Sequence, residues 1–318
     1  MSAPLESLHG SLPLPWGGRR FWLGVWRVAD PKITLASVAS LFLGTAAAAR
    51  DGALHVGYLA LTVLGIFLLE AAKNMSGELF DWDSGTDQRV APEDRSPFSG
   101  GKRVLVDRLM TRRQTIVVAF VLYALGGAVG LLVTLHEPRV LWLGVAGAAI
   151  AFFYHAPPLK LSYRGLGELA VMAAYGPMIL CGTYIVQRGT VAPWLLHLAT
   201  PLGIMIGAFL FVNEMPDARA DADSGKRTLV VRLGKARASR AFALFPLVAF
   251  GYLLALPAFA PVGPGAWLGF LGLPLAVAAA RRVWTSHART AELVPAQGWT
   301  LLSFVLLALG SGVGLLVF

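Results

Sequence analysis

The sequence predicts an all-helical protein that crosses a membrane many times. Of its 318 residues, 56% are apolar and only 14% are charged, and the mean hydropathy is +0.64. Such values are typical of polytopic membrane proteins. Nine apolar runs are long enough to cross a bilayer, or nearly so, which predicts nine transmembrane helices. The runs lie at about 33–49, 52–72, 115–134, 140–153, 166–186, 193–212, 241–260, 265–280 and 297–318.

The basic residues predict how these helices are oriented. If the N-terminus is cytoplasmic, only Arg50, Arg139 and Arg188 of the 27 Lys and Arg residues fall on the far side, and Lys73 lies at the end of a run. Such an excess on one side is the positive-inside pattern of cytoplasmic loops. We therefore expect an integral protein of the cytoplasmic (inner) membrane, with the N-terminus inside and the C-terminus outside.

The chain is expected to form one membrane domain. Residues 1–20 lack a long apolar core, and residues 1–30 are expected to form a cytoplasmic segment at the membrane interface, so the domain covers 31–318. The single cysteine, Cys181, lies in an apolar run and excludes an internal disulfide. No soluble domain presents the basic residues, so no nucleic-acid partner is expected. No obligatory protein partner is evident.

An acidic segment occurs twice, each time where an apolar run ends. The two copies share their spacing: Glu78, Asp81 and Asp87, then Glu214, Asp217 and Asp223. Each copy is followed by a basic stretch, GKRVLVDRL at 101–109 and GKRTLVVRL at 225–233, which match at seven of nine positions. Repetition with shared spacing favours a functional site over ordinary charges at helix ends.

The repeat also predicts the architecture. The acidic copies end the second and sixth runs, so four runs separate them and the repeats have the same orientation. We expect two parallel four-helix units, about 31–155 and 164–283, and a ninth helix at about 297–318. The long loop at about 75–113 contains prolines and glycines, and it is expected to cap a central cavity on the cytoplasmic side.

The acidic copies are typical of a site for divalent metal and diphosphate. Two sets of side chains share a helix face: Asn74, Glu78 and Asp81, and Asn213, Asp217 and Asp221, although Pro216 is expected to interrupt the last turn. Magnesium prefers oxygen ligands and usually shares them with water and phosphate. Four basic residues would neutralise the diphosphate: Lys102, Arg103, Lys226 and Arg227.

Two further regions contribute candidate residues. The loop YHAPPLKLSYRGLGE at 154–168 presents Lys160 and Arg164 near the inner surface, where they are expected to contact phosphate. Tyr154, in the same loop, serves either the site or interfacial packing. Glu70 lies within an apolar run on the same helix face as Asn74, and an intramembrane carboxylate is a candidate for contact with an acceptor.

These motifs resemble the UbiA superfamily of intramembrane aromatic prenyltransferases over about residues 30–318. The resemblance rests on FDWDSGTD at 80–87, PFSGG at 97–101, APPLK at 156–160 and NEMPDARAD at 213–221. It is greatest to the menaquinone branch, which prenylates 1,4-dihydroxy-2-naphthoate. It implies a helical bundle whose cavity opens sideways to lipid, and a Mg2+-dependent transfer of a polyprenyl group from its diphosphate to an aromatic ring.

The resemblance also implies roles for particular residues. The ligands of the Mg2+–diphosphate would be Asp81, Asp87, Asn213, Asp217 and Asp221. Asp81, Asp217, Tyr154, Lys160 and Arg164 would carry catalysis. The family usually has Asn four residues before its first central Asp, where this chain has Gly77, so Asn74 and Glu78 are expected to supply oxygens instead.

Two other classes of function compete with this interpretation. The same scaffold would serve a membrane terpene cyclase, or a transferase with a non-aromatic or different aromatic acceptor. A transporter is also compatible with nine spans and parallel repeats, but its polar residues would be expected at the centres of the spans.

Overall fold

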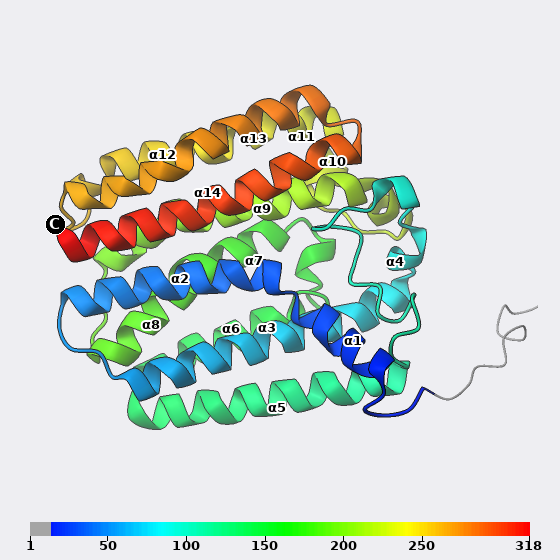
Figure 1. Ribbon diagram of the computed structural model, residues 1–318, viewed down its shortest axis with the longest axis horizontal. Helices are drawn as coiled ribbons and strands as arrows, with labels where there is room; N and C mark the ends of the chain where they lie inside the picture. The colour runs from blue at the N-terminus through cyan, green and yellow to red at the C-terminus, as the bar shows by residue number, and fades with distance from the viewer. Residues whose placement is uncertain (1–13) are drawn as a thin grey trace, which may run out of the picture.

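The computed structural model describes residues 14–318, and this part of the chain is a bundle of helices (Figure 1). The α-helices are α1 Arg19–Ala29, α2 Pro31–Arg50, α3 Val56–Ser84, α4 Thr86–Arg89, α5 Arg112–His136, α6 Leu141–Phe153, α7 Gly167–Ala173, α8 Ile179–Arg188, α9 Trp194–Asp223, α10 Leu229–Leu233, α11 Lys235–Phe242, α12 Leu244–Ala255, α13 Leu273–Ser286 and α14 Thr290–Val317. The principal other elements are the 3-10 segments η2 Pro92–Asp94 and η7 Pro264–Gly272, and the π-helical turn η5 Ala174–Met178. Residues 1–13 of the predicted interfacial segment lie outside the described residues.

Every predicted run is helical, but fewer helices than nine are long enough to be counted as spans. Seven helices among residues 14–318 have the length and composition to cross a membrane, and α2 makes an eighth if it is joined to α1 across a bend of 46°. The fourth predicted run is the short helix Pro138–Phe153. The protein is therefore an integral membrane protein, while the count of nine spans and the division into two repeats stay predictions.

The two helices that carry the acidic segments are longer than their apolar runs. The runs end at 72 and 212, whereas α3 continues to Ser84 and α9 to Asp223. Each helix therefore extends about three turns beyond its apolar part. Pro216 does not interrupt α9, which corrects the expectation from the sequence. The acidic side chains are thus held on rigid helix extensions rather than on loops.

The bundle is built around α9 and α14. Both helices are largely buried, and the main core includes Leu202, Met205 and Phe209 of α9 with Phe304 and Leu307 of α14. Helix α2 packs against α8 and α14, and α3 packs against α5. Burial of these apolar side chains fixes the positions of α3 and α9, and therefore of the acidic residues at their ends.

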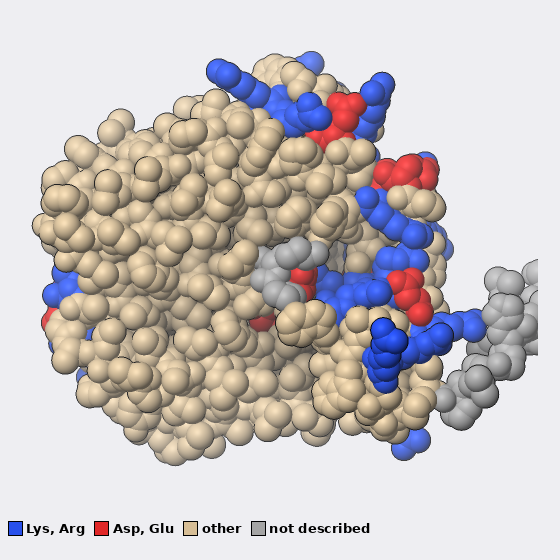
Figure 2. Space-filling view, in the orientation of Figure 1, with Lys and Arg blue, Asp and Glu red and all other residues tan. Residues whose placement is uncertain are grey.

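Charged side chains gather at one end of the bundle. In Figure 2 they lie over the end formed by α1, α4, α10 and α11 in Figure 1, while the sides of the bundle are almost without charge in this view. Helix α1 is held to this end by ion pairs, in which Arg27 contacts Asp107 at 2.6 Å and Lys102 contacts Asp30. The loop between α4 and α5 contacts the ends of α3 and α9, where Leu105 bonds to Glu78 and Gly100 bonds to Asp217.

Candidate functional site

A polar cavity of about 430 Å3 lies at the charged end. Its walls come from the ends of α3 and α9, the loop between η2 and α5, the loop after α6, and the segment before α10. Eight residues predicted from the sequence line this cavity: Asp81, Lys102, Arg103, Tyr154, Asn213, Asp217, Asp221 and Lys226. Segments that are far apart in the sequence therefore meet at one place.

Lys226 joins the two acidic helices. Its Nζ lies 2.8 Å from Asp81 Oδ1 on α3 and 3.6 Å from Asp221 Oδ1 on α9. Burial by itself would lower the pKa of Lys226, but the charges of Asp81 and Asp221 hold that pKa well above its usual value. The carboxylates of the two helices therefore stabilise a buried positive charge at this position.

The carboxylate of Asp217 anchors the capping loop. Its Oδ2 accepts a hydrogen bond of 3.1 Å from the backbone N–H of Gly100. Its Oδ1 and the Oδ1 of Asn213, one turn earlier on α9, are buried without a hydrogen-bond partner among the described residues. Buried oxygens are rarely left unpaired, so both are candidate ligand contacts.

Asp87 lies directly behind the cavity wall, under Gly101. The φ angle of Gly101 is +73°, and a Cβ atom there would lie on the Asp87 carboxylate. Burial raises the pKa of Asp87 to about 8, and the charges of Asp81 and Glu78 add to this effect. Glycine at position 101 therefore allows the loop to approach Asp87 closely. A positive charge beside Asp87 would stabilise its carboxylate.

The donors fit a magnesium ion that shares its ligands with a substrate. Within residues 14–318, no three acidic, His or Cys side chains approach closely enough to hold a metal by themselves. The available donors are nevertheless carboxylate and amide oxygens, which Mg2+ prefers, and two of them are buried and unpaired. Mg2+ typically takes few protein ligands and completes its shell with water and phosphate. The residues are thus suited to an ion that bridges protein and diphosphate.

Asn74 and Glu78 do not line the cavity, although they share a helix face with Asp81. The Asn74 side-chain amide donates to the carbonyl of Val28 at 3.1 Å. Glu78 Oε1 accepts from the backbone N–H of Leu105 at 2.9 Å. Both side chains hold the cap and α1 against α3 through these atoms, and their role in place of the missing asparagine stays a prediction.

The predicted basic residues divide into two groups. Arg103 lines the cavity and donates to the backbone carbonyl of Asp87 at 3.0 Å. Lys160 and Arg164 lie outside the cavity: the Lys160 ammonium is 5.1 Å from the centre of the Tyr163 ring, and Arg164 donates to the carbonyl of Pro158. The side chain of Arg227 is exposed. Asp223, the third carboxylate of the second acidic copy, is exposed as well.

Two side chains that contact Asp81 were not singled out in the sequence. Tyr163 Oη donates to Asp81 Oδ1 at 3.0 Å, and His155 Nε2 lies 3.8 Å from Asp81 Oδ2. Burial lowers the pKa of His155 to about 4, although Asp81 opposes the shift. Both residues belong to the loop at 154–168, and the signal that could have found them is their position beside Lys160.

Gly77 provides the space that His155 occupies. A Cβ atom at position 77 would lie 2.7 Å from His155 Cε1. Gly77→Asn is therefore expected to overpack this contact and to reduce the free energy of unfolding by about 1–3 kcal/mol. The midpoint of thermal unfolding in detergent measures the loss. His155→Ala should restore most of it in the double variant, and an unshifted midpoint in Gly77→Asn alone would contradict the packing described here.

Tyr163 positions the Asp81 carboxylate, with Ser84 Oγ as a second partner at 2.9 Å. Tyr163→Phe is expected to lower turnover about 10- to 100-fold, because a hydrogen bond to a charged group is worth about 1.5–3 kcal/mol. Steady-state turnover at saturating substrate checks this. Tyr58→Phe is the matched control, since Tyr58 stacks on His136 at the other end of the bundle. Equal activity of both variants would contradict the role of Tyr163.

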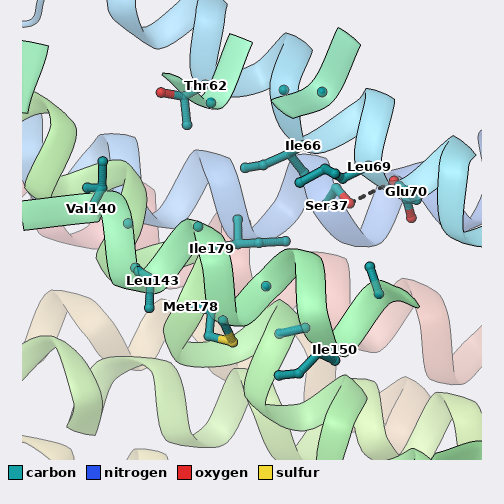
Figure 3. A pocket seen from close by; sticks show the side chains of 18 of the residues that line it. Ser37, Thr62, Ile66, Leu69, Glu70, Val140, Leu143, Ile150, Met178 and Ile179 are labelled. Carbon is teal, nitrogen blue, oxygen red and sulfur yellow. Dashed lines mark hydrogen bonds between the residues drawn. The ribbon is translucent and has the colours of Figure 1, made fainter. Parts of the chain in front are cut away.

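A second cavity, mostly apolar and of about 230 Å3, lies within the bundle. Tyr154 lines both cavities. Glu70 lies at one end, bonded to Ser37, while Thr62 and Val140 lie at the other (Figure 3). Glu70 also accepts from Tyr175 Oη at 2.7 Å. Tyr175 belongs to the π-helical turn η5, and such turns often re-aim side chains at functional sites.

Comparison with known proteins agrees with this arrangement. Residues 37–302 match the UbiA prenyltransferase family. A 1,4-dihydroxy-2-naphthoate octaprenyltransferase of Mycobacterium tuberculosis is 31% identical over 293 residues, which cover 88% of this chain and 92% of that one. The Escherichia coli protein of the same name is 29% identical over 259 residues, or 80% of this chain and 82% of that one.

Solved structures share the fold. A UbiA homologue from Aeropyrum pernix superposes with a TM-score of 0.65 and 16% identity, covering 91% of this chain and 97% of that one. A homologue from Archaeoglobus fulgidus, solved with DMAPP and Mg2+, gives a TM-score of 0.61 and 14% identity, covering 92% and 99%. The matched region spans most of the chain, including both acidic helices and the loop between them. The chain therefore belongs to the UbiA prenyltransferase family.

Proposed function

We propose that this protein transfers a polyprenyl group from a polyprenyl diphosphate to an aromatic acceptor, 1,4-dihydroxy-2-naphthoate, in a Mg2+-dependent reaction of menaquinone biosynthesis. One observation carries the proposal: carboxylates from α3 and α9 meet around a buried ammonium in a polar cavity that adjoins an apolar one. The names of the M. tuberculosis and E. coli relatives support the acceptor.

In this proposal the polar cavity holds the diphosphate. The metal ligands are Asp81, Asp87, Asn213, Asp217 and Asp221. Lys226, Lys102 and Arg103 line the same cavity and contact the phosphates, while Lys160, Arg164 and Arg227 lie nearer the surface, where they attract the anionic substrate. Asn74 and Glu78 support the cap. Tyr154 separates the diphosphate from the acceptor, and Glu70 lies on the acceptor side.

The chemistry follows from this separation of charge. Bound Mg2+ would supply positive charge that stabilises the departing diphosphate. Lys226 is released from Asp81 and Asp221 to pair with the same leaving group. As the C1–oxygen bond of the donor breaks, the electron-rich ring of the acceptor attacks C1 from the apolar side, and the ring then loses a proton. The apolar walls exclude water, which would otherwise convert the allylic cation to an alcohol.

The distribution of charge supports an orientation as well. Because the charged end carries most of the basic residues, it faces the cytoplasm in this proposal, and the site opens to that side of the inner membrane. The N-terminus is then inside and the C-terminus outside. Fusion of a reporter active only in the cytoplasm to Phe318 should give no signal, whereas a strong signal would reverse the orientation.

The test is product formation by the purified protein in detergent. The assay contains geranylgeranyl diphosphate, with or without 1,4-dihydroxy-2-naphthoate, in Mg2+ or in EDTA. The proposal predicts diphosphate release and prenylated product only when both Mg2+ and the acceptor are present. Release without acceptor would favour a terpene cyclase instead. No release with this or any other aromatic acceptor would contradict the transferase, and transport would then be the alternative to examine.

A further inference from the structure

The apolar cavity has an ammonium group in its wall that no carboxylate neutralises at close range. Lys73 lines this cavity on α3, three residues after Glu70. Among the residues that the structure describes, no carboxylate oxygen lies within 4.0 Å of its Nζ. Its Nζ lies 5.4 Å from the centre of the Tyr154 ring. A cation in apolar surroundings is costly, so an unpaired one is a functional candidate.

Glu70 is near enough in sequence to pair with Lys73, but other groups hold it. Residues three apart on a helix are neighbours, so an ion pair is geometrically available. Both carboxylate oxygens of Glu70 instead accept hydrogen bonds from hydroxyl groups. One comes from Ser37 Oγ at 2.9 Å (Figure 3), and the other comes from Tyr175 Oη at 2.7 Å. The cavity thus presents a carboxylate with its hydroxyl partners and, three residues along α3, an ammonium with no carboxylate within 4.0 Å among the described residues.

The position of Lys73 separates it from the groups assigned to the diphosphate. Lys102, Arg103 and Lys226 line the polar cavity, whereas Lys73 lines only the apolar one. Tyr154 lies between the two cavities and lines both. In the proposed function a diphosphate held by the acidic helices is therefore served by other cations, and Lys73 lines the cavity on the side assigned to the acceptor.

We propose that Lys73 binds the carboxylate of the acceptor, and that it selects an ionised aromatic hydroxy acid over a neutral phenol. The inference rests on the proposed function and deepens it by naming a specificity-determining residue. One ammonium matches one carboxylate, and charge-assisted hydrogen bonds of this kind are stronger than neutral ones. Glu70, three residues away on the same face, accepts a hydrogen bond from a ring hydroxyl of the acceptor.

The test measures binding of the acceptor alone, so that turnover is not needed. The full-length protein is purified in detergent with EDTA and without prenyl diphosphate, and it is titrated with 1-hydroxy-2-naphthoate or with 1-naphthol. Wild type should bind the acid more tightly than the phenol. Lys73→Met should lose about tenfold or more in affinity for the acid and less than about twofold for the phenol. Lys73→Arg should retain the preference, which shows that charge is what matters.

Lys102→Met is the matched control, because it removes an ammonium from the polar cavity. It should leave the affinity for 1-hydroxy-2-naphthoate unchanged and weaken binding of a non-cleavable geranylgeranyl thiodiphosphate in Mg2+. Unchanged binding of the acid by Lys73→Met would overturn the proposal. Weaker binding of the thiodiphosphate by Lys73→Met, with the acid unaffected, would also overturn it and assign Lys73 to the donor. Failure of thiodiphosphate binding in wild type, with the acid preference intact, would contradict the proposed transfer and leave the acid site standing.

Discussion

Asp81→Asn is expected to lower turnover at least about a hundredfold while the protein still inserts and folds. The carboxylate of Asp81 is the point on α3 where three neighbours meet: Lys226 at 2.8 Å, Tyr163 at 3.0 Å and His155 at 3.8 Å. Asparagine keeps the size of the side chain but removes the charge that Lys226 and the proposed metal ion require. The loss should therefore appear in diphosphate release, with a small change in the thermal midpoint.

Asp83→Asn is the matched control for this experiment. Asp83 lies two residues later on the same helix, but it is exposed and pairs with Arg112 at 2.9 Å. Exposed ion pairs contribute little, so turnover should stay within about twofold of wild type. Comparable losses in Asp81→Asn and Asp83→Asn would mean that the helix end matters only as a charged surface.

Asp217→Asn is expected to have an effect of similar size, for two reasons. One carboxylate oxygen holds the capping loop through the Gly100 N–H, and the other is buried without a partner. The amide oxygen of asparagine can still accept from Gly100, so the cap should stay in place. Loss of the negative charge, however, removes a proposed metal ligand from α9, and turnover should fall about a hundredfold or more.

The control on α9 is Asp223→Asn. Asp223 ends the second acidic copy in the sequence, but its side chain is exposed at the end of the helix. Turnover of this variant should match that of wild type in the same release assay. If Asp223→Asn is the damaging change and Asp217→Asn is not, then the linear spacing of the acidic copies identifies the ligands better than the cavity does.

Much of the fold could be predicted because long apolar runs directly indicate membrane helices. All the runs are helical, and the ends of α2 and α5 lie close to the expected bounds, whereas α14 begins at Thr290, before the expected start at about 297. The extensions of α3 and α9 could not be predicted in the same way, since hydropathy measures what lies in lipid and ends where polar residues begin. Helix continues there because it packs against the cap and against α10, and a sequence window does not contain those contacts.

The sequence predicted the outline of the candidate site, but it did not predict the contacts of the individual side chains. The repeated acidic segments predicted which helices meet. Helical spacing also placed Asn74 and Glu78 on the face of Asp81, but spacing cannot tell what packs against each turn of that face. Those two side chains form hydrogen bonds with the backbone of α1 and of the cap. His155 fills the space beside Gly77, a contact that only the folded chain reveals.

The most direct test of the central claim is the binding of geranylgeranyl thiodiphosphate, because it asks whether the acidic helices jointly hold a metal–diphosphate. Binding would be measured for wild type, Asp81→Asn and Asp217→Asn, each in Mg2+ and in EDTA. The account predicts tight binding only for wild type in Mg2+, with a loss of about tenfold or more in either variant and in EDTA. Equal binding of wild type in Mg2+ and EDTA, or binding unaffected by either substitution, would contradict it.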